Sequence, residues 1–504
     1  MLEMLMSGFI SILQPENLIY IFGGVVLGVI MGAIPGLTAT MAIALIIPLT
    51  YTLTPTQSLI MLLAAYNAGT FGGSISAILI GTPGTPAAAA TVKDGYQLAL
   101  QGKGGKAIKT ALFASCFGCI FSSIILIIIA QPIAKFALNF GPAEYAVLMI
   151  FSLTLIASAS GGNIKKGLIG GAFGLIAGCV GMDAVYSIPR LSFGVMKLSS
   201  GIDLVVMLVG MLAMSEILKQ VESIAEGHTE AHLPEPKDKK DYAFTKEDLK
   251  LSIPHWLRSS PLGCAIGALP GLGPALACFL GYDMAQRFAK EPEKFGKGSV
   301  EGVAAAESAN NAVCGANMIP LLSLGVPGDT GAAIIIGAFI VQGLTPGPLI
   351  FKESPETVYN VYAGLIVCNI ALAIVVLLLW KLFAKICSIE TTLIFPCILM
   401  FCIIGVYALN RSLVDVWIML VFGVIGYLLS KFKFPMAPIL IGFILSPIFE
   451  KNFRRALTLY DGDYGIFFSS PLCWVFWIVT AVSVLVLVRG YLKRTKAQKE
   501  AMEF

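Results

Sequence analysis

Long apolar runs constrain the fold of this chain more than any other feature of its sequence. The runs Ala111 to Ala130, Val361 to Trp380 and Cys473 to Val488 approach the roughly 20 residues that an α-helix needs to cross the hydrocarbon core of a membrane. A transmembrane β-barrel would show alternating apolar and polar residues instead, and no such pattern is visible. The runs therefore predict several membrane-spanning helices.

Composition excludes several classes of protein. The mean hydropathy is +0.84, and 57% of the residues are hydrophobic while 13% are charged, unlike a soluble globular protein. The N-terminus, MLEMLMSGF, lacks the basic residues of a cleaved signal peptide. Nothing supports nucleic-acid binding, and no GxxxxGK[ST] motif indicates a nucleotide-driven pump. Energy for transport would have to come from an ion gradient or from other subunits.

One apolar stretch, residues 298 to 343, contains an unusual number of polar residues and a Gly-Val-Pro-Gly break. Polar groups inside a bilayer are costly and usually face a pathway or a partner. A helix broken at membrane depth is tolerated only where protein or a water-filled cavity satisfies the freed backbone groups. The polar residues are Glu301, Glu307, Ser308, Asn310, Asn311, Asn317, Asp329 and Thr330. The stretch therefore predicts a transport site.

Two linked motifs occur twice in the chain. The pattern GxxxGxxPGL occupies residues 28–37 and again 263–272, an offset of 235. The pattern Gly-x-Pro-Gly occupies residues 81–84 and 325–328, and it is preceded by Asn67 and Asn311, all at an offset of 244. Two linked motifs at nearly the same offset indicate an internal duplication.

The distribution of basic residues predicts how the two halves are oriented. An alternating inside and outside assignment of the loops places 26 of the 34 lysines and arginines inside. The loop around Lys103 is then inside, whereas its counterpart around Lys352 is outside, so the halves have opposite topology. The number of membrane crossings agrees with this assignment if each Pro-Gly-Leu segment, about 18 to 50 and 259 to 285, enters and leaves on the same side of the membrane. If these segments cross the membrane fully, the number of crossings changes, and the basic residues no longer favour opposite orientations as strongly.

We therefore expect an all-α polytopic membrane protein with two inverted-topology repeats, discontinuous helices or re-entrant hairpins, and about 11 to 12 spans. The expected parts are an N-terminal repeat (1–219), a cytoplasmic hydrophilic linker (220–250), a C-terminal repeat (251–450), and a final span with a basic cytoplasmic tail (451–504).

No lysine or arginine remains inside a predicted span, so an anionic substrate would have to be held by other groups. Discontinuous helices supply them, because half-helix N-termini face anions and unwound carbonyls coordinate sodium. The candidate substrate- and ion-binding residues are Pro35, Gly36, Asn67, Ser74, Thr82, Pro83, Gly84, Thr85, Pro270, Gly271, Glu307, Ser308, Asn310, Asn311, Asn317, Pro327, Gly328, Asp329 and Thr330.

These candidates have alternative interpretations. The asparagines suit a substrate or Na⁺, and also hydrogen bonding between helices. Thr82, Thr85, Asp329 and Thr330 suit ligand contact or capping of the following half-helices. Glu307 suits binding of Na⁺, carriage of a proton, or pairing with a polar neighbour. We expect a possible Na⁺ site near Asn67, Asn311 and Glu307.

No other metal site is expected. Cys116 and Cys119 form a CxxC, but within a spanning run and without further ligands. His228 and His232 lie in the hydrophilic linker and leave a ligand set incomplete.

Several segments resemble the large membrane subunit of the tripartite tricarboxylate transporter family (TctA type). They include GAIPGL, NAGTFGGSISAILIGTPGTP, GPAEY, PGLGPALACFLGYDMAQR, FGKGSVEGVAAAESANNA, IPLLSLGVPGDTGAAIIIGAF and GLTPGPLIF. The resemblance runs through nearly the whole chain. One departure is Ala306, where the family usually has proline before the glutamate.

The resemblance implies import of carboxylates such as citrate across the bacterial inner membrane, coupled to Na⁺ or H⁺. It also implies a small membrane subunit (TctB type) and a periplasmic substrate-binding protein (TctC type), neither of which this chain encodes. An elevator-like or rocking movement follows only by analogy with other inverted repeats.

Two other classes remain as alternatives. A stand-alone carrier or channel for small organic anions would not need coupled uptake. A membrane enzyme would need a nucleophile, a metal cluster or an acid pair in register, and no such arrangement is apparent. We therefore expect no enzymatic activity and no cofactor besides the coupling ion.

Overall fold

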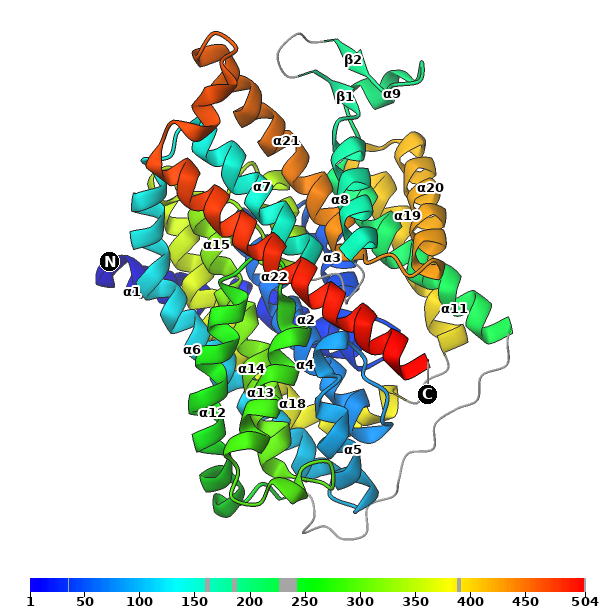
Figure 1. The fold of residues 1–504 in the computed structure, drawn as a ribbon. Coiled ribbons are helices and arrows are strands. Elements are labelled where there is room, and N and C mark those ends of the chain that lie inside the picture. Colours follow the sequence, from blue (N-terminus) through cyan, green and yellow to red (C-terminus); the bar gives the residue numbers. More distant parts are fainter. Residues whose placement is uncertain (35, 159–163, 184–187, 226–242, 388–390, 503–504) are drawn as a thin grey trace.

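The computed structural model is mostly helical, and it describes residues 1–504 except 35, 159–163, 184–187, 226–242, 388–390 and 503–504 (Figure 1). The first half contains α1 (Leu2–Ile12), α2 (Pro15–Ala33), α3 (Ala39–Thr50), α4 (Pro55–Leu79), η1 (Pro86–Ala88), α5 (Thr91–Leu100), α6 (Gly104–Ala137), α7 (Pro142–Ser158), α8 (Ile164–Gly178), β1 (Gly181–Met182), β2 (Pro189–Arg190), α9 (Met196–Ser199), α10 (Leu204–Leu208), the π-helix η2 (Val209–Met214) and α11 (Ser215–Ala225). The second half contains α12 (Lys246–Gly267), α13 (Gly273–Phe288), η4 (Pro292–Lys294), α14 (Val300–Ala316), α15 (Met318–Leu324), α16 (Thr330–Val341), α17 (Ile350–Glu353), α18 (Pro355–Ile386), α19 (Thr391–Asn410), α20 (Leu413–Lys431), α21 (Met436–Leu459), η5 (Tyr464–Phe468) and α22 (Pro471–Met502).

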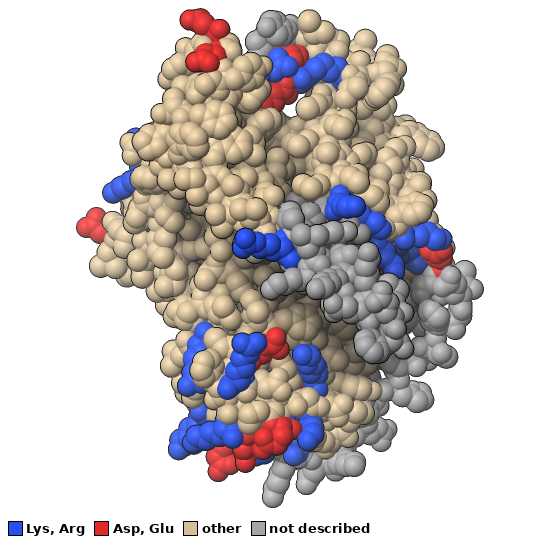
Figure 2. Space-filling model, in the orientation of Figure 1, with Lys and Arg blue, Asp and Glu red and all other residues tan. Residues whose placement is uncertain are grey.

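The helices are those of a polytopic membrane protein. Among the described residues, seven helices are long and apolar enough to cross a membrane: α2, α4, α6, the segment Leu204–Glu222, α18, α20 and α21. Large apolar side chains face outward on these helices, including Leu378 at 76% exposure and Trp417 at 68%. Figure 2 shows that much of the molecular surface seen in that view carries no charged side chain. Such a surface is stable against lipid, which confirms the predicted all-α membrane class.

Each half repeats the same order of elements. A helical hairpin (α2–α3 or α12–α13) is followed by a buried helix (α4 or α14 with α15) and then by a Pro-Gly break. A short helical segment (η1 with α5, or α16) leads into a long helix (α6 or α18) and three further helical segments. Asn317 separates α14 from α15, where Pro320 removes the backbone donor that Ala316 would need.

Rows of glycine allow each hairpin to lie directly against the next buried helix. A Cβ atom on Gly28 of α2 would lie 2.5 Å from the Ala65 carbonyl oxygen of α4, and one on Gly267 of α12 would lie 2.9 Å from that of Val313 in α14. Glycine is thus required at both positions. Along α2 and α4 the contacts advance in the same direction, so the two helices are parallel and α3 must return the chain between them.

The long helix of each half packs against the buried helix of the other half. Helix α6 packs against α14, while its counterpart α18 packs against α4. At the centre, α4 and α14 cross antiparallel, since Tyr66 contacts Asn317 and Ser74 contacts Glu307. Between these contacts, the Cys314 thiol donates to the Thr70 hydroxyl at 3.6 Å. These two residues are 244 positions apart, the offset of the Pro-Gly breaks, so each contacts its own counterpart.

Helix boundaries differ from the expected segment boundaries at three places. Helix α11 continues past 219 to Ala225, and α12 begins at Lys246 rather than after 250 because Thr245 and Asp248 form a capping box. Helix α21 continues past residue 450 to Leu459. At the expected boundary, Glu450 forms ion pairs with Arg454 and Arg190. Residues 226–242 of the expected linker, with both of its histidines, lie outside the described residues. Helix α14 is continuous through Ala306.

A buried aspartate ties the two halves together near α5. Asp94 Oδ1 accepts hydrogen bonds from the backbone N–H groups of Gly296, Gly298 and Ser299 at 2.8–2.9 Å. Its Oδ2 accepts one from the Tyr282 hydroxyl at 2.9 Å. The carboxylate thereby fixes the loop that leads into α14.

We expect Asp94→Asn to destabilise the protein by about 2–4 kcal/mol, because charge-assisted bonds to a buried carboxylate are lost. The measurement is the thermal unfolding midpoint of the purified chain in detergent. Tyr282→Phe removes only one of the four bonds and should cost less. Equal unfolding midpoints for wild type and Asp94→Asn would show that the charge of this carboxylate does not stabilise the fold.

Candidate functional site

Four breaks in the helices meet at one cavity of about 360 Å³. The first half contributes the start of α3 and the start of η1, and the second half contributes the start of α13 and the start of α16. Tyr66 and Thr70 of α4, Leu212 of η2 and the start of α21 complete the wall. The lining residues are Thr38, Ala39, Thr40, Tyr66, Thr70, Thr85, Pro86, Ala87, Leu212, Gly271, Leu272, Gly273, Pro274, Ala275, Asp329, Thr330, Met436, Ala437 and Ile441.

Helix N-termini give the cavity its chemistry. Thr38 caps α3 by accepting from the Met41 N–H at 3.2 Å, and Asp329 caps α16 by accepting from the Ala332 N–H at 2.7 Å. Helix α13 starts at Gly273 on the same wall. The partial positive charge of helix N-termini attracts anions. No lysine or arginine is among the lining residues.

A hydrogen-bonded chain connects the cavity with the crossing of α4 and α14. The Tyr66 hydroxyl donates to Asp329 Oδ2 at 2.7 Å and accepts from Asn317 Nδ2 at 2.8 Å. Asn317 Oδ1 in turn lies against Gly328 of the second break. The second Pro-Gly break is therefore linked to the first-half helix α4 through side chains. Gly271 N–H also donates to the Gly328 carbonyl, at 2.7 Å, which joins the second hairpin to this break.

Glu307 forms a second polar centre, fully buried on α14. Its carboxylate accepts from the Ser74 hydroxyl at 2.6 Å, from the Thr91 hydroxyl, and from the Ser115 hydroxyl at 3.1 Å. Asn311 Nδ2 donates to Ser115 at 2.8 Å and lies 3.5 Å from Glu307 Oε2. The donors come from α4, α5, α6 and α14, and none of the bonds described for this carboxylate comes from a basic side chain. An ionised carboxylate buried in this way needs a proton or a cation.

Several buried polar atoms near these centres have no hydrogen-bond partner among the described residues. They are Asn67 Nδ2, Thr85 Oγ1, Asn310 Nδ2, Asn310 Oδ1 and Asn317 Oδ1. Leaving such groups unpaired is costly, and each needs an explanation. Atoms of this kind are suited to a bound ion or substrate. Oxygen ligands such as the Glu307 carboxylate and the hydroxyls of Ser74, Thr91 and Ser115 fit a hard monovalent cation.

Comparison with known proteins identifies the family. The sequence model of the tripartite tricarboxylate transporter TctA family matches residues 18–441. This chain belongs to the TctA family. The match confirms the resemblance inferred from the sequence motifs, and it includes both hairpins, both breaks and Glu307.

Two relatives from Agrobacterium vitis are similar to this TctA chain. One is named "Uncharacterized 52.8 kDa protein in TAR-I ttuC' 3'region"; it is 37% identical over 465 residues, which is 92% of each chain. The other, "Uncharacterized protein in TAR-II ttuC' 3'region", is 40% identical over 210 residues, which is 42% of this chain and 87% of the relative. No solved structure matches the chain.

Most of the predicted site residues of this TctA chain lie in or near the cavity and the second polar centre. Thr85, Gly271, Asp329 and Thr330 line the cavity. Pro270, Gly328 and the Asn317 side chain lie buried behind it, with Pro327. Ser74, Glu307 and Asn311 form the second centre, whereas Asn67 bonds the Cys119 thiol at 3.4 Å and Asn310 is unpaired.

Other predicted residues lie elsewhere in the TctA chain. Gly36 packs against Gln220 of α11, and the Ser308 hydroxyl bonds its own helix at Ala305. Gly84 is buried at Gly73, whose carbonyl accepts its N–H at 3.2 Å. Thr82 is exposed, Pro83 is half-buried, and Pro35 lies outside the described residues.

The capping role is confirmed for one of the four residues that flank the breaks, and the other three make no capping bond. Asp329 does cap α16, and Thr330 is its first residue. Thr85 directly precedes η1, but its side chain makes no capping bond. Thr82 lies outside any helix.

Sequence reasoning missed Thr38, Tyr66, Thr91 and Ser115. Tyr66 directly precedes Asn67, and Thr38 directly follows the first Pro-Gly-Leu motif, so proximity to the motifs was an available signal. Thr91 and Ser115 contact Glu307 from 216 and 192 residues away, which no local pattern indicates.

Proposed function

We propose that this TctA chain is the membrane subunit through which a tricarboxylate or related carboxylate enters the cell by symport with Na⁺ or H⁺. The observation that carries the proposal is the cavity at which helix N-termini from both halves meet without any basic side chain. Such a site attracts several carboxylates through backbone N–H groups and still releases them, since no fixed ion pair has to be broken.

The coupling ion in this proposal binds at Glu307. A proton on the carboxylate, or a cation held by its oxygens and the neighbouring hydroxyls, neutralises the buried charge. Thr91 of α5 donates to this carboxylate, and α5 follows η1, whose start lines the cavity. Loading of the ion at Glu307 and closure of the cavity around the substrate are therefore linked through one short segment. Movement of one bundle against the other, elevator-like or rocking, then exposes the cavity to the opposite side.

We further propose that residues 1–219 and 251–450 are inverted repeats, with the linker and the C-terminus in the cytoplasm. The antiparallel crossing of α4 and α14, and the contact of Thr70 with its counterpart Cys314, support this proposal. Equivalent helices that cross antiparallel are related by a two-fold axis perpendicular to them. Because α4 has the length and composition of a span, that axis would lie in the membrane plane.

Cysteine labelling checks the topology. We expect a membrane-impermeant maleimide to label Lys352→Cys in intact spheroplasts and Lys103→Cys only after permeabilisation, in a background in which the exposed Cys397 is replaced by serine. These positions precede the equivalent helices α18 and α6. Labelling of both from the same side would show parallel repeats instead.

The transport experiment uses proteoliposomes that hold this chain, its small TctB-type subunit and its TctC-type binding protein. Accumulation of labelled citrate or a related carboxylate that depends on a Na⁺ or H⁺ gradient is the expected result. Equilibration without a gradient or a binding protein would favour the alternative, a stand-alone carrier or channel for organic anions, and would remove the coupling claim.

A further inference from the structure

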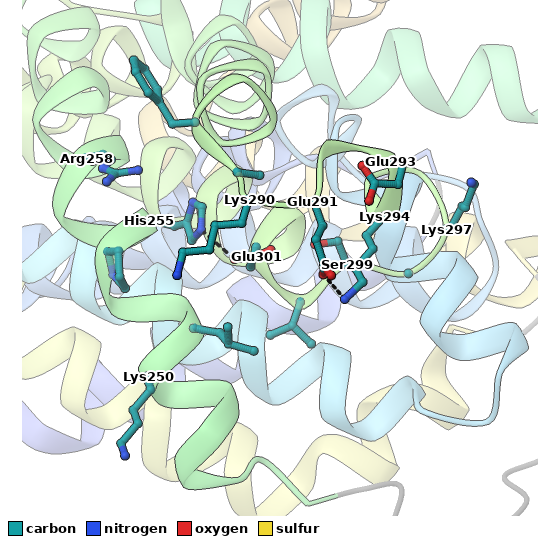
Figure 3. Close-up of a pocket in the computed structure, with 16 residues that line it drawn as sticks. Lys250, His255, Arg258, Lys290, Glu291, Glu293, Lys294, Lys297, Ser299 and Glu301 are labelled. Carbon is teal, nitrogen blue, oxygen red and sulfur yellow. Dashed lines mark hydrogen bonds and ion pairs between the residues drawn. The ribbon is translucent and has the colours of Figure 1, made fainter.

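A second cavity, a basic cleft of about 960 Å³, lies at the end of the molecule where α12, the α13–α14 connection and the start of α14 meet (Figure 3). We propose that this cleft binds the headgroup of an anionic phospholipid, with the acyl chains lying along the outer faces of α12 and α13. The basic loops place this end on the cytoplasmic side.

The charges in the cleft favour an anionic ligand. Five basic side chains line it, Lys250, Arg258, Lys290, Lys294 and Lys297, against three acidic ones, Glu291, Glu293 and Glu301. Lys294 pairs with Glu291, and Glu301 hydrogen-bonds His255 Nε2 at 3.2 Å. No ion pair engages Lys250, Lys290 or Lys297 within the part of the chain that the structure describes. Figure 3 shows Lys290 beside His255 and Glu301, facing the open centre of the cleft.

The fold itself does not require this cluster. The equivalent connection in the first half, between α3 and α4, is residues 51–54 and contains no charged residue. The connection between α13 and α14 is residues 289–299 and supplies Lys290, Lys294 and Lys297. The second half thus carries an added basic loop at a place where the first half has a short neutral turn. A larger basic loop at the membrane surface is suited to binding phosphate.

The cleft is preorganised by the aspartate described above. Gly298 and Ser299, which line the cleft, donate their backbone N–H groups to Asp94. The wall therefore keeps its shape without a ligand, and the ordering of a loop does not reduce affinity.

The apolar surface next to the cleft distinguishes a lipid from a soluble anion. Phe288 lines the cleft and is 67% exposed, with the Arg258 guanidinium 5.7 Å from its ring centre. Both helices carry further exposed apolar residues: Leu251, Leu257, Leu276, Phe279 and Leu280. A molecule with phosphate at one end and hydrocarbon at the other matches both surfaces. A free phosphate would leave the apolar part unexplained.

The test measures lipid binding by the purified full-length chain. Phosphatidylglycerol, phosphatidylcholine or inorganic phosphate is added in neutral detergent, and the thermal unfolding midpoint and the lipids retained in native mass spectrometry are recorded. We expect phosphatidylglycerol to raise the midpoint and to remain bound, while the other two have no effect. For Arg258→Gln/Lys290→Gln we expect roughly a 30-fold loss of affinity, since each basic residue near the surface contributes about 1 kcal/mol.

The control Lys352→Gln/Arg411→Gln removes the same charge from exposed positions at the other end and should bind like wild type. Arg258→Lys/Lys290→Arg should also retain binding. Unfolding of the Gln double variant at the wild-type temperature without lipid shows that it is folded. Equal stabilisation of wild type and the Gln double variant by phosphatidylglycerol would overturn the proposal. Stabilisation by inorganic phosphate alone would overturn it as well, because the ligand would then be a soluble anion.

Discussion

We expect Glu307→Gln to reduce gradient-driven uptake by about 100-fold, which corresponds to the upper range of coupling energies between two ligand sites. Glutamine has the same shape and can still accept from Ser74 and Thr91, so the helices should pack as before. It carries no charge, and it therefore neither attracts a cation nor takes up and releases a proton. The measurement is initial uptake of labelled carboxylate into proteoliposomes, with and without the ion gradient.

An exchange assay, in which internal carboxylate is replaced by external carboxylate, tests substrate binding separately from ion coupling. Glu307→Gln should retain exchange of internal for external carboxylate, because the cavity and its helix N-termini are unchanged. Glu356→Gln, at the exposed start of α18, provides the matched control and should transport like wild type. Wild-type accumulation by Glu307→Gln would show that the coupling ion binds elsewhere. Loss of exchange together with uptake would make Glu307 part of the substrate site instead.

The sequence predicted the features that are local. Pro and Gly at fixed offsets marked the breaks at 81–86 and 325–328, because no continuous helix can pass them. The apolar runs marked α6, α18 and α22. The stretch 298–343 was identified as a site because Glu307 and several asparagines are too polar for a lipid-facing helix. Each of these inferences depends on residues close together in the chain.

Other features depend on how distant segments pack. Ser115 reaches Glu307 because Gly118 allows α6 to lie against the backbone of Ser308. The Thr85 hydroxyl is unpaired although the residue directly precedes η1, which no capping rule foresees. The cavity itself is formed by the starts of four helical segments spread over about 300 residues, and no periodicity in the sequence reports their convergence.

Thr85 provides the second test with a large expected effect. Its hydroxyl is unpaired, and the residue is 4% exposed and lines the cavity at the first break. We expect Thr85→Val to raise the KM for the carboxylate by roughly 10- to 100-fold, because a hydrogen bond to a charged group is worth about 1.5–3 kcal/mol. Valine has nearly the same shape, so the packing of Thr85 against Gly73 is kept.

Two further variants decide whether the lost hydroxyl is responsible. Thr85→Ser restores the hydroxyl and should bring the KM close to that of wild type. Thr110→Val makes the same chemical change at a buried threonine of α6 whose hydroxyl already donates to the Lys106 carbonyl at 3.0 Å, and transport should be unaffected. An unchanged KM in Thr85→Val would mean that the substrate does not contact the first break. In that case the anion would be held without η1, through the N-termini of α3, α13 and α16, and the two breaks would have unequal roles despite their common offset.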